Sequence, residues 1–85
     1  MVLKHNIVYV LIFLLANTTL AQTLNGIIKD QDNNLLFGAT IYNSINLKST
    51  ISDENGKFSI EATTGKNKLV ISYVGYTTKV LKLNG

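Results

Sequence analysis

Short runs of β-favouring residues alternate with clusters of Gly, Asn and Asp at close intervals from residue 22 to the end of the chain. This region contains no proline, and none of its runs has apolar residues spaced three and four apart over enough length for a helix. Closely spaced short strands separated by turn residues are typical of a β-sandwich or a barrel. We therefore predict an all-β fold, a small β-sandwich, for residues 22–85.

Six strands are predicted in this region, each near the usual length of about five or six residues. Their approximate ranges are 24–29, 39–42, 48–52, 57–61, 68–74 and 77–83. The run 68–74 is the most apolar, which predicts a central strand. Lys79 and Lys82 interrupt the last run, and lysines of this kind are suited to the edge of a sheet.

The strongest turn signal is Asp53-Glu54-Asn55-Gly56. Asn-Gly readily takes the positive φ that tight hairpins require, so a hairpin is predicted between the runs on either side. Gly75 interrupts the apolar residues after run 68–74 and predicts a bulge or bend.

The first 21 residues have the layout of a secretory signal peptide. Residues 1–6 include Lys4, residues 7–16 are an uninterrupted apolar run, and residues 19–21 end in Leu20-Ala21 with small residues at the positions that signal peptidase reads. An uncleaved anchor is the alternative, but the apolar run is half of the roughly 20 residues that a spanning helix needs. We predict cleavage after Ala21, a mature domain of residues 22–85 without a membrane span, and export to the periplasm or outer membrane.

The composition argues against catalysis. The chain has no cysteine, and its one histidine, His5, lies in the predicted signal peptide. Disulfides, thiolate zinc sites, a cysteine nucleophile and a lipid-modified cysteine are therefore excluded. The histidine most often used for acid–base chemistry is also missing from the mature chain. We predict no enzyme activity and no catalytic, cofactor-binding or metal-binding residues.

The charge of the chain does not indicate a nucleic-acid partner. The formal net charge is +3, with eight lysines and no arginine, and the lysines are spread along the sequence. A nucleic-acid-binding surface usually clusters its basic residues and includes arginine. The lysines are therefore interpreted as a solvated surface.

Two acidic clusters are candidates for cation sites. Asp30-x-Asp32-x-Asn34 matches the first half of a calcium loop, but Leu35 and Ile41 stand where such a loop needs Gly and Glu. This segment is interpreted as a solvated turn, and residues 53–55 as part of the hairpin turn.

Three aromatic residues are candidates for contacts. Tyr73 and Tyr76 could bind a sugar or a partner, but the favoured interpretation packs one ring in the core with its hydroxyl on a backbone group. Phe37 precedes Gly38 in a predicted loop and is the apolar side chain best placed to contact a partner.

Four segments, taken in order, resemble the carboxypeptidase-regulatory-like domain, also called the CarboxypepD_reg-like or prealbumin-like (transthyretin-like) domain. GIIKD at 26–30 is similar to its G-x-V-x-D strand, and LFGATI at 36–41 to PL-x-GA-x-V. SDENGKFSI at 52–60 is similar to T-D-x-x-G-x-F-x-I, and LVISYVGY at 69–76 to L-x-I-S-Y-V-G-Y. The structural motif residues carried over are Gly26, Asp30, Gly38, Ala39, Asp53, Gly56, Phe58, Tyr73, Gly75 and Tyr76. Leu35 stands where the family often has proline, which leaves a looser turn.

The resemblance implies a prealbumin-like sandwich of seven strands, one more than the pattern predicts. It also implies an accessory domain that precedes the plug and barrel of a TonB-dependent (SusC/RagA-like) outer-membrane receptor, with other domains or subunits of that transport complex as partners. Alternatives left open are a stand-alone periplasmic or secreted module that binds carbohydrate or peptide, and a regulatory domain beside a peptidase. A domain of this size buries only about 60 % of its unfolded surface, so docking on a larger neighbour would stabilise it.

Overall fold

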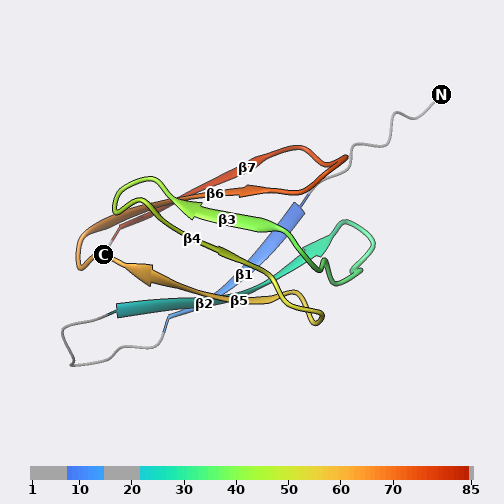
Figure 1. The fold of residues 1–85 in the computed structure, drawn as a ribbon, viewed down its shortest axis with the longest axis horizontal. Helices are drawn as coiled ribbons and strands as arrows, with labels where there is room; N and C mark the ends of the chain where they lie inside the picture. The colour runs from blue at the N-terminus through green and yellow to red at the C-terminus, as the bar shows by residue number, and fades with distance from the viewer. Residues whose placement is uncertain (1–7, 15–21, 85) are drawn as a thin grey trace.

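A computed structural model describes residues 8–14 and 22–84 of the chain, the side chains of 13, 14 and 84 excepted. These residues form seven strands: β1 (Val8–Leu14), β2 (Gln22–Asp30), β3 (Thr40–Asn43), β4 (Lys48–Ile51), β5 (Lys57–Ala62), β6 (Lys66–Ser72) and β7 (Lys79–Asn84). They make a three-stranded sheet in the order β1-β2-β5 and a four-stranded sheet in the order β4-β3-β6-β7, with antiparallel neighbours (Figure 1). The predicted all-β sandwich is confirmed.

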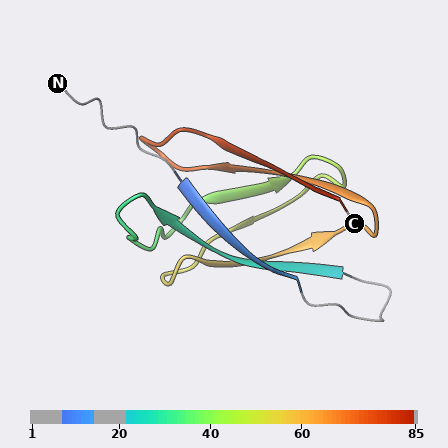
Figure 2. The same ribbon diagram turned by 180° about the vertical axis from the view of Figure 1, so that it is seen from behind.

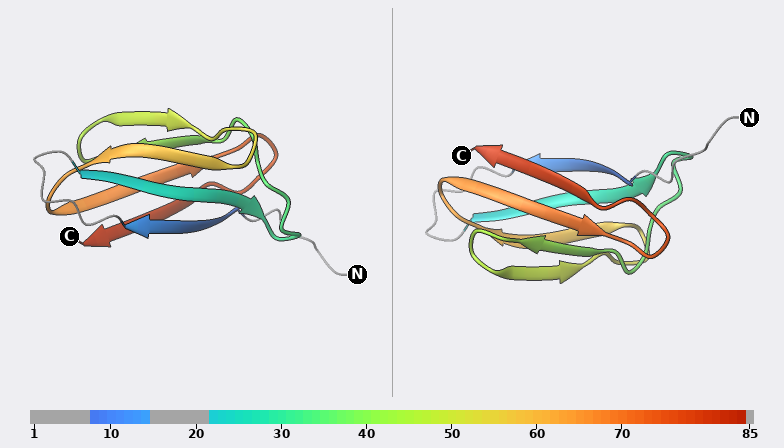
Figure 3. Two further views of the ribbon diagram at one scale, coloured as in Figure 1. Left: turned by 90° about the horizontal axis from the view of Figure 1, so that it is seen from below. Right: turned by 90° about the horizontal axis from the view of Figure 1, so that it is seen from above.

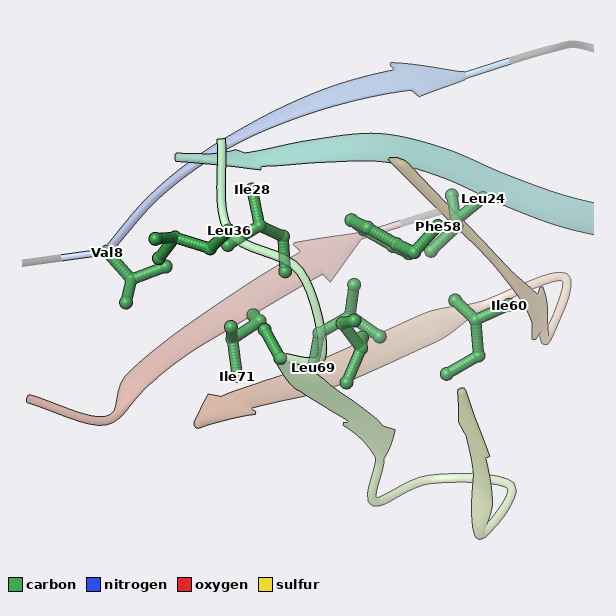
Figure 4. Packing of buried hydrophobic residues seen from close by; sticks show 10 residues of the cluster. Val8, Leu24, Ile28, Leu36, Phe58, Ile60, Leu69 and Ile71 are labelled. Atoms are coloured by element: carbon green, nitrogen blue, oxygen red, sulfur yellow. The ribbon is translucent and has the colours of Figure 1, made fainter. Parts of the chain in front are cut away.

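The two sheets pack face to face, and their inward side chains form one core (Figure 3). Alternation along the strands makes this possible, since successive side chains point to opposite faces. In β5, for example, Phe58 and Ile60 are buried while Lys57, Ser59 and Glu61 are exposed. Figure 4 shows the cluster, which consists of Val8, Leu24, Ile28, Leu36, Ala39, Ile41, Phe58, Ile60, Leu69 and Ile71.

The six strands predicted after residue 22 are all present, and no strand end is shifted by more than two residues. β6 lies between β3 and β7, so the prediction of a central strand is confirmed, and both Leu69 and Ile71 are fully buried. β7 is an edge strand that carries Lys79 and Lys82, also as predicted.

The predicted hairpin at residues 53–56 is wrong. A turn is present there, with a hydrogen bond of 2.9 Å from the Gly56 N–H to the Asp53 carbonyl. However, β4 pairs with β3 and β5 pairs with β2, so this turn carries the chain from one sheet to the other. Turn residues determine only that the chain changes direction locally. Which strands then pair depends on the packing of the whole fold.

Gly75 lies in a turn between β6 and β7, so a bend rather than a bulge is found there. Its φ is +84°, and the Tyr76 N–H donates to the Tyr73 carbonyl at 3.0 Å. A glycine in this left-handed conformation closes a four-residue turn without the penalty of a side chain.

The seventh strand comes from the predicted signal peptide. β1 pairs with β2 along its whole length, from Val8 opposite Asp30 to Leu14 opposite Leu24, and Figure 2 shows the two strands together. The predicted cleavage point after Ala21 and His5 both lie outside the described residues, so cleavage stays a prediction. No helix capable of crossing a membrane occurs in the described ranges.

Candidate functional site

The most elaborate polar cluster is built around Asp30, the last residue of β2. Its side chain is buried, with 4 % of the residue exposed. Oδ1 accepts hydrogen bonds of 2.9 Å from the N–H groups of Asp32 and Asn34, which shapes the turn that follows. Oδ2 accepts from the Asn34 side-chain amide and from the Tyr76 hydroxyl, both at 3.1 Å. The carboxylate thus joins the β2 turn to the turn after β6.

This arrangement corrects two predictions. Asp30 is not part of a solvated turn, because only the later residues of that segment, such as Asp32 and Asn34, are exposed. The Tyr76 hydroxyl reaches a carboxylate, not a backbone group. The Tyr73 and Tyr76 rings contact each other at a centroid distance of 5.4 Å, and both pack partly buried against the core.

The hydrogen bonds set the charge state of this cluster. Burial alone would raise the pKa of Asp30, but the hydrogen bonds from Asn34, Asp32 and Tyr76 favour the ionised carboxylate and lower its pKa below the ordinary value. The same bond to Asp30 raises the pKa of Tyr76, and burial of the hydroxyl acts in the same direction. At neutral pH the pair is therefore a carboxylate that accepts from a neutral phenol.

We predict that the cluster makes the domain sensitive to acid. Because the folded state lowers the pKa of Asp30, its stabilising effect is present above the ordinary value near 3.8 and is lost as the pH falls through the folded pKa. Asp30→Asn should reduce the free energy of unfolding at pH 7 and flatten its decline below pH 4. Denaturant unfolding at a series of pH values measures both effects. Glu54→Gln, which removes an exposed carboxylate from the turn before β5, should keep the wild-type acid profile. Parallel acid profiles for Asp30→Asn and the wild type would contradict this role.

A buried serine holds the loop that leads into β3. Ser52 follows β4 directly and is 1 % exposed. Its hydroxyl donates to the Leu36 carbonyl at 2.7 Å and accepts from the Ala39 N–H at 2.9 Å. The backbone of Ser52 also bonds to Gly38 and Ala39. Four hydrogen bonds therefore fix the segment that contains the motif residues Gly38 and Ala39.

Two buried asparagines organise the opposite end of the sandwich. Asn43 donates to Asn67 Oδ1 at 2.9 Å and accepts from the Ile45 N–H at 3.1 Å. Asn67 also accepts from the Thr63 N–H at 2.8 Å and donates to the Thr63 carbonyl at 3.2 Å. The pair thus links the loop after β3 to the loop before β6. Both residues lie between strands predicted from the sequence, and nothing in the sequence pattern indicates that they are buried.

The remaining motif residues act at separate places. Gly26 allows close packing, since an added Cβ would lie 2.6 Å from both the Leu11 carbonyl oxygen and the Phe58 ring. Asp53 Oδ1 accepts from the Asn55 N–H at 2.8 Å and the Lys57 N–H at 3.0 Å, which closes the turn before β5. The structure brings Asp30, Tyr73 and Tyr76 together, places Phe58 against Gly26, and joins Gly56 to Asp53 by a backbone hydrogen bond. All ten motif residues have roles in packing, turns or loop attachment.

The part of the surface that the structure describes carries a shallow groove and several exposed apolar side chains. The groove has a volume of about 720 Å³ and is lined by β2, β4 and β5, including Ile27, Ile51 and Lys57. Phe37 is 62 % exposed, so its predicted exposure is confirmed, while its proposed contact with a partner stays a prediction. No group of three or more potential metal ligands occurs among the residues described.

Comparison with known families supports the resemblance noted in the sequence. The family model of the CarboxypepD_reg-like domain matches residues 24–85, which is most of the chain. Comparisons with curated proteins and with solved structures give no significant match. The match begins within β2 and includes all four motif segments together with the Asp30 cluster and Ser52. The chain therefore belongs to the CarboxypepD_reg-like domain family.

Proposed function

We propose that the chain is an exported, non-catalytic accessory domain that mediates contacts between proteins. The observation that carries this proposal is the use of its buried polar groups. Asp30, Asn43, Ser52 and Asn67 all hold loop backbone in place through hydrogen bonds within the domain. Their side chains serve the architecture, as expected of a rigid module whose function lies on its surface.

Membership of the CarboxypepD_reg-like family supports the proposal of an exported accessory domain. The domain family is regulatory or accessory in character, and the apolar run at residues 7–16 fits a signal peptide. On this basis we propose that the domain lies in the periplasm, as the N-terminal extension of a TonB-dependent outer-membrane receptor. Its partners would then be the other domains or subunits of the transport complex.

Mass spectrometry of the native protein tests this proposal. We expect a mature N-terminus at Gln22 and a polypeptide that continues into the plug of a receptor. Recovery of a product that still begins at Met1 would contradict export. A mature protein that ends at Gly85 would contradict the receptor setting and favour a stand-alone binding module.

A further inference from the structure

The outer edge of β2 carries a strand whose inward face fits the core. β1 pairs with β2 over seven residues, and Val8 is fully buried within the core cluster. Val10 and Ile12, the next two residues on the same face, pack against that cluster. Figure 4 shows the Val8 side chain pointing between the sheets. The position beside β2 is thus a slot for three alternating aliphatic side chains.

The slot is also shaped for the backbone of its occupant. Gly26, opposite Ile12 in the register, leaves room for the Leu11 carbonyl, which would lie 2.6 Å from an added Cβ. On the outward face, Tyr9 lies opposite Lys29, and the Lys79 ammonium group lies 5.8 Å from the centre of the Tyr9 ring. Two lysines therefore surround this position, which favours an aromatic or acidic side chain there.

The outward face of β1 is unusual for a permanent edge strand. Tyr9 and Leu11 are 45 % and 49 % exposed, whereas β5 presents Lys57, Ser59 and Glu61 on its outward face. Edge strands that stay in place are normally protected by charged residues. The apolar character of both faces of β1 is what a signal peptide requires. Within the fold, the core contacts of β1 are made by its inward residues Val8, Val10 and Ile12.

Removal of β1 would leave this slot open. Cleavage after Ala21 would expose the edge of β2, uncover the side chains of Leu24 and Ile28, and reduce the first sheet to β2 and β5. A two-stranded sheet with one apolar edge is marginally stable and readily accepts a further strand.

We propose that the outer edge of β2 is a strand-acceptor site for a partner protein. The partner supplies an extended segment that runs antiparallel to β2. It carries branched aliphatic residues at the positions of Val8, Val10 and Ile12, and an aromatic or acidic residue at the position of Tyr9. β1 occupies this site until it is removed. This inference rests on the proposed export, because export removes the first occupant.

Strand exchange tests the site in the complete chain. The 85-residue protein is produced without export, with a protease recognition sequence in place of residues 15–21. After cutting, a labelled peptide of residues 8–14 with flanking lysines is added, and its capture is followed by fluorescence anisotropy. We expect the labelled peptide to replace the original strand. A peptide with Val8→Asp and Val10→Asp should bind about 100-fold more weakly, because two buried aliphatic groups are lost. The matched outward change, Leu11→Thr, should alter affinity by less than about threefold.

Each alternative result has a defined meaning. If the cut protein unfolds when its strand is washed out, refolding by the matched peptide but not by the aspartate peptide would support the site. Three results would overturn the proposal. These are a matched peptide that does not refold the cut protein, equal binding of all the peptides, and a stable dimer of the cut protein that excludes the peptide. Because the assay uses no receptor, failure here can be distinguished from failure of the proposed receptor setting.

Discussion

Gly56→Ala should lower the free energy of unfolding by about 2–5 kcal/mol. Gly56 has a φ of +73°, where an L side chain is strained, and an added Cβ would lie 2.5 Å from the Ile28 carbonyl oxygen. That oxygen belongs to β2, and the Ile28 N–H donates to the Gly56 carbonyl at 2.7 Å, so neither backbone can move away without breaking the contact. Equilibrium denaturant unfolding measures the loss.

Two other glycines separate the effect of backbone strain from the effect of the close approach to β2. Gly38 has a φ of +86° with no atom within 4 Å of an added Cβ, so Gly38→Ala tests backbone strain alone and should cost about 1–2 kcal/mol. Gly65 has open space and no positive φ, so Gly65→Ala should stay within about 0.5 kcal/mol of the wild type. Equal losses at Gly56 and Gly38 would show that the close approach to β2 does not matter.

Ser52→Ala should destabilise the domain by about 2–4 kcal/mol. The hydroxyl is buried and bonds both the Leu36 carbonyl and the Ala39 N–H. Each buried backbone group that loses such a partner costs about 1–3 kcal/mol. Loss of these bonds should also loosen the segment before β3, which hydrogen exchange at Ala39 would detect.

Ser49→Ala is the matched control for this prediction. Ser49 lies on β4, three residues before Ser52, and its side chain is exposed. Its removal should change the free energy of unfolding by less than about 0.5 kcal/mol. If the Ser52 and Ser49 variants were equally stable, the hydroxyl of Ser52 would not be holding the loop.

The contacts of Asp30 and Ser52 illustrate what could not be predicted. Tyr76 is 46 residues from Asp30, and Leu36 is 16 residues from Ser52. Residues 30–34 read as a polar turn, and nothing in that segment indicates that its first carboxylate is buried under a tyrosine. A single sequence indicates distant contacts of this kind only through a family pattern. The family pattern identified Asp30, Tyr73 and Tyr76 as motif residues, but it did not predict that their side chains touch.

The apolar run at residues 7–16 shows a different limit of prediction from sequence. Its length and flanking residues fit a signal peptide, and its inward residues Val8, Val10 and Ile12 also fit the edge of β2. A continuous apolar run has no polar face that would restrict it to one environment. Its place in the fold depends on the slot beside β2, which the rest of the chain creates.

The sequence by itself determined the class of fold, the positions of six strands and the existence of the turns at Gly56 and Gly75. These features follow from alternation and from backbone preferences, both of which act between residues close in the chain. Only the tertiary structure decided that β4 and β5 belong to different sheets, that Asn43 and Asn67 are buried together, and that Val8 completes the core. Those outcomes depend on long-range packing, because the free energy of pairing two segments is set by the surface they bury together and not by either segment alone.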